Sequence, residues 1–175
     1  SGKLSLTELT DIETKILSEL GRKIQAEFSY NDQTFELPDV LNSRQAQCVS
    51  YTQMVFAVAS GLGFSVEGVN VLKMSKPLSL GRGHVVSLVG TADKRVVFVD
   101  ITRDPLKTVS PPFDLRERFE RDGNYLVLKP EYENIDDAGR FKRIQLLDLN
   151  GLIACIYRNR GVIDHKSGKY QQAIA

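Results

Sequence analysis

Hydrophobic residues near the start of the chain recur every three or four positions. This spacing, over residues 7–24, predicts an amphipathic helix with Thr7 or Thr10 as its N-cap. The polar stretch YNDQTF then predicts a turn, and Pro38 argues against a helix through ELPDVLNS. The apolar residues expected on the inner face of the first helix are Leu9, Ile12, Ile16, Leu20 and Ile24.

A longer apolar run predicts a second, buried helix. We expect it to begin between Ser43 and Gln47 and to end at the stretch SGLGF, where Gly61 and Gly63 supply a stop. Its first turn would hold Cys48.

Several segments rich in β-branched residues follow. SVEGVNVLKM, HVVSLVG and RVVFVDI predict strands, and TADK between the last two predicts a hairpin. PPFDLRERFERDG predicts a short helix and NYLVLK a further strand, and a last helical stretch is expected from about Arg143. This order of elements predicts an α+β fold, with N-terminal helices packed on an antiparallel sheet.

The predicted hairpin places a histidine beside an acid. If its turn is centred on Ala92, His84 faces Asp100, and facing residues have Cβ atoms about 4.5–5.5 Å apart. An imidazole and a carboxylate at that separation can form a hydrogen bond. The residues expected to form an apolar floor beneath the pair are Val86, Leu88, Val96 and Phe98.

Cys48 is a candidate third residue of a catalytic site with His84 and Asp100. A thiolate at a helix N-terminus is favoured by the helix dipole and by a nearby imidazolium, and the acid would orient the ring. Each residue also has a plainer interpretation. Cys48 could be a small core residue, His84 structural, and Asp100 the cap of a strand end. Together they favour an active site.

Length, charge and cysteine spacing argue against several classes of function. The 175 residues suit a folded domain with a sizeable core, and 23 basic against 22 acidic residues give a formal charge of +1. Without a block of like charges or a run of about 18 apolar residues, nucleic acid and membranes are poor candidate partners. Cys48 and Cys155 show no CxxC spacing, so we expect no disulfide framework, metal site or cofactor. The opening SG looks like a trimmed end, which leaves the compartment open between cytoplasmic and exported.

Residues 44–102 resemble the core of the transglutaminase-like superfamily, a branch of the papain-like cysteine enzymes. The resemblance lies in RQAQCVSYTQMVFAVASGLG, GHVVSLVG and VVFVDIT, about a third of the chain. It implies a papain-like domain over residues 1–142 with Cys48 as nucleophile, His84 as base and Asp100 as the orienting acid.

The sequence departs from that family at two places. Family members commonly have Gly two residues before the cysteine, where this chain has Ala46, and an aromatic soon after the histidine, where it has Val85 and Val86. A second oxyanion donor, beside the backbone N–H of the cysteine, has no motif to place it. The candidates are Gln47, Gln45 and Asn42.

Residues 143–175 are expected to form a helical extension. IYRNRGVIDHKSGKYQQAIA resembles the first part of a tetratricopeptide repeat, with Tyr157, Gly161, Tyr170 and Ala173 at the repeat's spacing. This resemblance implies protein partners and a longer protein in which further repeats follow, as in similar bacterial domain pairings.

We expect no role in catalysis for His165, Cys155 or a mild acidic cluster. His165 is expected on the surface of the extension, and Cys155 in core packing. The mild acidic cluster, expected in a solvated loop, is Glu131, Glu133, Asp136 and Asp137.

The sequence therefore predicts cysteine-dependent acyl chemistry on an amide in a peptide or protein, through a thioester on Cys48. Water as acceptor would make the protein a peptidase or amidase, and an amine would make it a transglutaminase-like transferase; we expect hydrolysis. The alternative is a non-catalytic protein-binding module of the same fold, coupled to tetratricopeptide repeats.

Overall fold

The fold is α+β, and its centre is a six-stranded antiparallel sheet. A computed structural model describes residues 3–75 and 83–173. The strand order is β5-β4-β3-β8-β7-β6. These strands are β3 (Val66–Met74), β4 (His84–Gly90), β5 (Val96–Val99), β6 (Phe119–Asp122), β7 (Tyr125–Leu128) and β8 (Phe141–Leu147).

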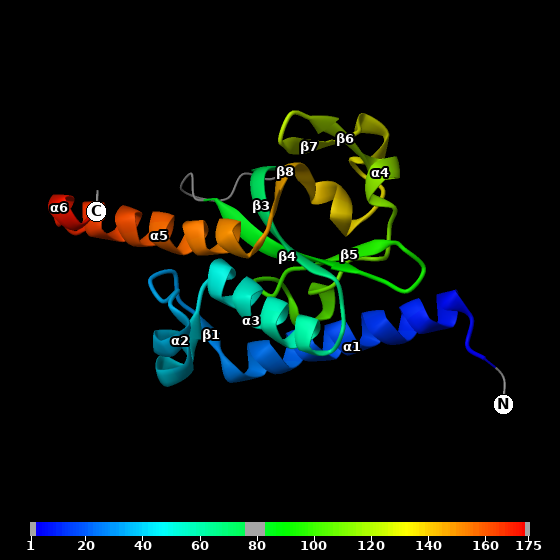
Figure 1. Cartoon of the computed structure of the whole chain (residues 1–175), viewed down its shortest axis with the longest axis horizontal. Coiled ribbons are helices and arrows are strands. Elements are labelled where there is room, and N and C mark those ends of the chain that lie inside the picture. Colours follow the sequence, from blue (N-terminus) through cyan, green and yellow to red (C-terminus); the bar gives the residue numbers. More distant parts are fainter. Residues whose placement is uncertain (1–2, 76–82, 174–175) are drawn as a thin grey trace.

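Helices surround this sheet (Figure 1). The helices α1 and α3 lie below β4 and β5, the β6–β7 hairpin and α4 lie above, and α5 runs out to the side with α6. A two-residue parallel pair of strands, β1 (Ser29–Tyr30) and β2 (Gln45–Ala46), precedes α3. The helices are α1 (Leu6–Glu27), α2 (Leu37–Ser43), α3 (Cys48–Gly61), α4 (Leu115–Arg118), α5 (Leu149–Lys166) and α6 (Tyr170–Ala173).

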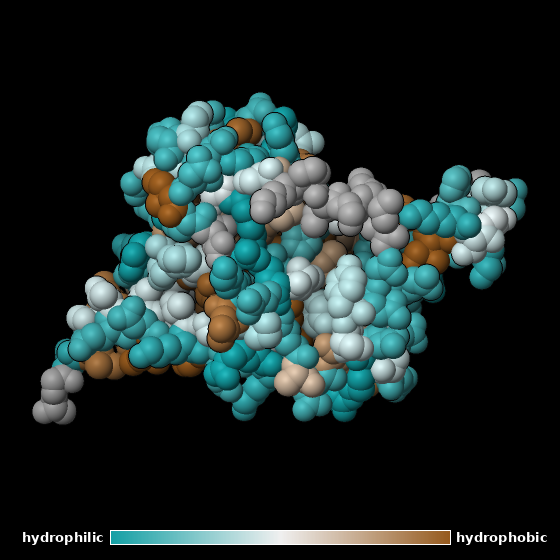
Figure 2. Space-filling view, turned by 180° about the vertical axis from the view of Figure 1, so that it is seen from behind, coloured by the Kyte–Doolittle hydropathy of each residue, from teal (hydrophilic) through white to brown (hydrophobic). Residues whose placement is uncertain are grey.

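The first helix is present, but its cap and its inner face differ from the prediction. Ser5, not Thr7 or Thr10, is the N-cap, because Ser5 and Glu8 form a reciprocal capping box. Its buried residues are Thr10, Leu17, Gly21 and Ile24. Ile12 and Ile16, expected inside, are each 42% exposed, and Figure 2 shows apolar side chains along this outer edge of α1 at the lower left. Leu17 and Ile24 enter the core, and between them Gly21 allows a close approach to Thr108.

The second and third helices follow from local sequence. Pro38 does not prevent a helix: it lies in the first turn of α2, where a missing N–H costs nothing. The third helix ends at Gly61 and holds Cys48 in its first turn, as predicted. It begins at Cys48, just after the predicted range, because residues 45–46 form β2 and Gln47 is the N-cap.

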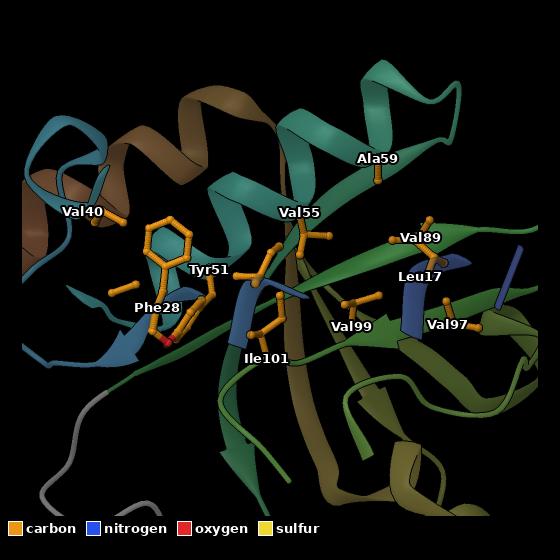
Figure 3. Close-up of a cluster of buried hydrophobic side chains, with 12 residues drawn as sticks. Leu17, Phe28, Val40, Tyr51, Val55, Ala59, Val89, Val97, Val99 and Ile101 are labelled. Atoms are coloured by element: carbon orange, nitrogen blue, oxygen red, sulfur yellow. The ribbon is translucent and has the colours of Figure 1, made fainter. Parts of the chain in front are cut away.

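Two hydrophobic clusters lie on opposite faces of the sheet. The cluster between the sheet and the N-terminal helices is shown in Figure 3, and fully burying a side chain such as Leu17 contributes about 1.5–3 kcal/mol. On the other face, Val86, Leu88 and Phe98 are buried and Val96 packs against them, which confirms the predicted apolar floor.

The hairpin that carries His84 is shifted from the predicted register. Leu88 pairs with Phe98 and Val89 with Val97, so the turn is centred on Asp93, not on Ala92. The turn closes through the N–H of Thr91, which donates to the carbonyl of Arg95. The shift moves each partner by two residues, so the side chains that share a face are unchanged.

Two predicted helices are strands in part. Only residues 115–118 of PPFDLRERFERDG are helical, because β6 pairs with β7 across a turn at Gly123, whose φ is +60°. Residues 141–147 form β8 between β3 and β7, so the helical extension begins at Leu149 and not near Arg143. The boundary expected after residue 142 thus falls inside a strand.

In the described part of the chain, none of the helices is both long enough and apolar enough to cross a membrane.

Candidate active site

Cys48 is fixed at the point where α3 meets the start of β4. It is the first residue of α3 and 9% exposed. The backbone N–H of Gln47 donates to the carbonyl of Thr34 at 3.1 Å, which holds the chain just before the helix. Thr52 lies one turn into α3, and its Oγ1 is 2.9 Å from the carbonyl oxygen of Cys48 and 3.2 Å from that of Val85. The hydroxyl therefore ties the first turn of α3 to the residue that follows His84.

His84 and Asp100 form a buried pair. His84 is the first residue of β4 and 6% exposed, and Asp100 directly follows β5. The imidazole Nε2 lies 3.0 Å from Oδ2 of Asp100. In the observed register the two residues are diagonal neighbours on one face rather than directly opposed, and diagonal neighbours remain within reach of long side chains.

The Asp100 carboxylate has two further partners. Thr102 donates to Oδ1 from its hydroxyl at 2.6 Å and from its backbone N–H at 3.2 Å. Arg140 donates from Nη2 to Oδ2 at 2.7 Å, the same oxygen that contacts His84. The guanidinium of Arg140 also lies over the ring of Phe141, 4.3 Å from its centroid. The carboxylate is therefore held in place from three sides.

Sequence reasoning missed both of these partners. Thr102 carries a local signal, because an Asp accepting bonds from the residue two positions on is a common turn. Arg140 is 40 residues from Asp100 and carries no such signal.

Burial disfavours the charged forms of His84 and Asp100, whereas their hydrogen-bond partners favour these forms. Burial lowers the pKa of His84, but hydrogen bonds and negative charge from Asp100 and Cys48 outweigh it and raise that pKa to about 10. Burial likewise acts against ionised Asp100, yet the bonds from His84 and Thr102 and the charge of His84 hold its pKa below the usual range. Because Asp100 contacts Nε2, Nδ1 is the ring nitrogen left for Cys48.

The second cysteine packs beside the first. Cys155, on α5, is half-buried against a cluster that contains Cys48, Val85 and Leu152, which agrees with the expected core packing. Burial raises the pKa of the Cys155 thiol, while Arg158 acts in the opposite direction.

The three oxyanion candidates have different surroundings. Gln47 is 7% exposed; its Oε1 accepts a bond from Asn159 of α5 at 3.3 Å, and its Nε2 is buried without a hydrogen-bond partner among the described residues. Gln45 accepts a bond from Asn31 at 2.7 Å, and Asn42 is exposed on α2. A buried amide N–H group without a partner costs about 1–3 kcal/mol, so Gln47 is the candidate that calls for an explanation.

The three residues at the two departures from the resembled family are all buried. Ala46 is fully buried in β2, and among the described non-glycine residues only Arg44 and Lys94 have positive φ. An alanine side chain is therefore accommodated without backbone strain. Val85 and Val86 are buried on opposite faces of β4.

The remaining candidate residues lie away from this site. His165 is exposed on α5, as expected, and its ring packs against Tyr170. Glu131 and Glu133 are exposed, as expected of a solvated loop, whereas Asp136 pairs with Arg118. Asp137 begins the short 3-10 helix Asp137–Arg140. Within residues 3–75 and 83–173, no group of three or more His, Cys, Asp or Glu side chains is placed to hold a metal ion.

Comparison of the chain with models of known protein families and with curated protein sequences finds no match.

Proposed function

We propose that this chain carries out cysteine-dependent acyl chemistry on an amide or peptide substrate. Cys48 is the nucleophile, His84 the acid and base, and Asp100 the residue that orients the imidazole. The observation that carries the proposal is the buried ring of His84, which contacts the Asp100 carboxylate on one side and Cys48 on the other. A thiol, a base and a group that orients the base are what nucleophilic thiol catalysis requires.

The order of elements supports a papain-like, transglutaminase-like fold for this site. In the resembled superfamily the cysteine opens a helix, the histidine follows on a strand and the aspartate ends the next strand. Here Cys48 opens α3, His84 opens β4 and Asp100 directly follows β5.

The first half-reaction forms a thioester. The Cys48 thiolate attacks the carbonyl carbon of the amide, and the carbonyl oxygen takes up the negative charge. The imidazolium of His84 then gives its proton to the amine nitrogen, and the C–N bond breaks. The amine leaves, the acyl group stays on sulfur, and Asp100 keeps the ring oriented throughout.

The second half-reaction releases the acyl group. His84, now neutral, takes a proton from water as the water oxygen attacks the thioester carbonyl. The C–S bond breaks, and the products are a carboxylic acid and the original thiolate–imidazolium pair. An amine in place of water would give transfer instead, and hydrolysis is the reaction that we propose.

Two donors are available for the negative oxygen. Cys48 is the first residue of α3, so its backbone N–H has no acceptor within the helix. Gln47 is the second, because its buried Nε2 has a free donor next to the nucleophile in sequence.

Trapping the acyl-enzyme tests the proposal without knowledge of the natural substrate. We expect p-nitrophenyl acetate to leave an acetyl group on Cys48, located by peptide mapping and mass spectrometry. His84→Ala should lose most of this labelling, and Cys155→Ser should retain it. Acetylation shared equally between Cys48 and Cys155 in the unmodified protein, or unaffected by His84→Ala, would contradict the proposal.

A second candidate function is protein binding without catalysis. It is supported by the C-terminal helices, where large side chains of α5 and α6 stay uncovered: Tyr157 is 66% and Tyr170 is 62% exposed. Residues 167–169, with a turn at 167–168, join the two helices, as the proposed start of a tetratricopeptide repeat requires. An inert Cys48 in the trapping experiment would favour this alternative.

A further inference from the structure

We propose that Asn159 is a positioning residue, which turns the Gln47 carboxamide so that Nε2 serves as the second oxyanion donor. The C-terminal helix α5 is then part of the catalytic unit and not an appended extension. This inference rests on the proposed function, since it concerns the same reaction at Cys48.

The hydrogen bond between Asn159 and Gln47 fixes which way the Gln47 carboxamide is turned. Asn159 donates from Nδ2 to Oε1 of Gln47 at 3.3 Å. An amide NH₂ group can only donate, so it must meet the oxygen of Gln47. The nitrogen of Gln47 is thereby left on the other side of its carboxamide, buried and without a partner among the described residues.

Other contacts hold α5 against the site independently of Asn159. Leu152 packs so closely on β3 that a Cβ at Gly68 would lie 2.5 Å from its Cδ2. Arg160 forms an ion pair with Glu36 at 2.8 Å. The guanidinium of Arg158 lies beside Gly83, the residue before His84.

Leu152, Cys155 and Asn159 are three and four residues apart, so they share one face of α5. That face meets the N-terminal end of α3. Figure 1 shows α5 running beside this end of α3. Substitution at Asn159 should therefore leave α5 in place and change only the orientation of the Gln47 amide.

The change Asn159→Asp reverses the direction of the hydrogen bond at this contact. An ionised aspartate can only accept, so it would draw the NH₂ of Gln47 toward itself and turn Oε1 toward the developing negative charge. Asn159→Ala would remove the contact and leave the amide free to adopt either orientation. The aspartate variant should therefore be the more damaging of the two.

Two reactions at the same sulfur separate this role from thiol activation. Alkylation of Cys48 by iodoacetamide is a displacement at carbon and forms no oxyanion, whereas acylation by p-nitrophenyl acetate passes through one. Removal of one oxyanion donor typically costs about 10²–10³ in rate. The ratio of acylation rate to alkylation rate therefore reports on the donor alone.

We expect Asn159→Asp to lower this ratio by about a hundredfold or more, and Asn159→Ala by about tenfold, with alkylation little changed. Gln47→Met, which lacks the donor, should match the aspartate variant. Asn150→Asp is the matched control, since it makes the same change at an exposed position of the same helix, and should leave the ratio unchanged.

An unchanged ratio in Asn159→Asp, or an equal fall in both rates, would overturn the inference while the proposed function stands. Asn159→Ala carries the same test should the aspartate variant fail to fold. Cys48 reacting no faster than Cys155 with either reagent in the unmodified protein would overturn the proposed function, and this inference with it.

Discussion

At the scale of single residues, the ionisation of His84 depends on how the Asp100 carboxylate is shared. Oδ2 accepts from both His84 and Arg140, and Oδ1 accepts from Thr102. These bonds keep the buried carboxylate ionised, and it in turn favours the imidazolium. These contacts favour the charged form of the His84 ring and fix its orientation.

The first prediction concerns the protonation of this ring. The pKa of His84 is raised to about 10, so the imidazole should stay protonated at pH 8, where a histidine with the usual pKa of about 6.5 is neutral. Asp100→Asn should move the midpoint downward, because it removes the negative charge that favours the imidazolium. Imidazole ¹⁵N shifts measured by NMR from pH 5 to 10 report the titration.

His165→Gln assigns the second histidine signal and serves as the control for this titration. A His84 midpoint near 6.5, unchanged by Asp100→Asn, would contradict the electrostatic account.

The sequence predicted part of this residue-scale picture for a clear physical reason. The strand period of two places His84 and Asp100 on one face, and a register error of two residues leaves that result intact. Arg140 and Asn159 reach the site from far along the chain, and only the tertiary fold brings them there.

At the scale of elements, the junction of α3 with β4 sets the position of Cys48. The helix begins at Cys48 and the strand at His84, and Thr52 is the polar side chain that joins them. Because Thr52 is buried, water cannot take the place of the contacts that its hydroxyl makes with the two carbonyl groups.

The second prediction tests this junction. Thr52→Val keeps the shape and helix propensity of the side chain but removes the hydroxyl, and it should lower the free energy of unfolding by about 1 kcal/mol. Thr52→Ser keeps the hydroxyl and is the matched control. Urea unfolding followed by circular dichroism measures both. Loss of stability in Thr52→Ser but not in Thr52→Val would show that the methyl group, not the hydroxyl, matters at this position.

The strand β8 shows where pattern reasoning at the element scale fails. Its buried residues are Phe141, Ile144 and Leu147, a spacing of three that is typical of a helix. The pairing of β3 with β8 shifts register between Val71 and Met74, which lets Phe141 and Ile144 face the same cluster. Leu147, in the regular part of the strand, packs in a different cluster with Leu152. The irregularity depends on the partner strand and leaves no mark in the segment itself.

At the scale of the whole molecule, the candidate site is assembled from segments spread over most of the chain. The helix α3, the ends of β4 and β5, the residue before β8 and the helix α5 all contribute side chains. The α+β class was predictable from the order of local patterns. The position of α5 beside Cys48 was not, because it depends on packing such as that of Leu152 on Gly68.

The alkylation of Cys48 by iodoacetamide, followed from pH 5 to 9, tests the central claim most directly. An ordinary thiol, with a pKa of about 8.5, has little thiolate at pH 6, whereas a cysteine paired with an imidazolium keeps it. We expect Cys48 to react at pH 6 at least about tenfold faster than a free model thiol, His84→Ala to abolish this advantage, and Cys155 to stay slow. If Cys48 reacts no faster than the model thiol across this range and His84→Ala makes no difference, Cys48 is not an activated nucleophile and the protein-binding function takes its place.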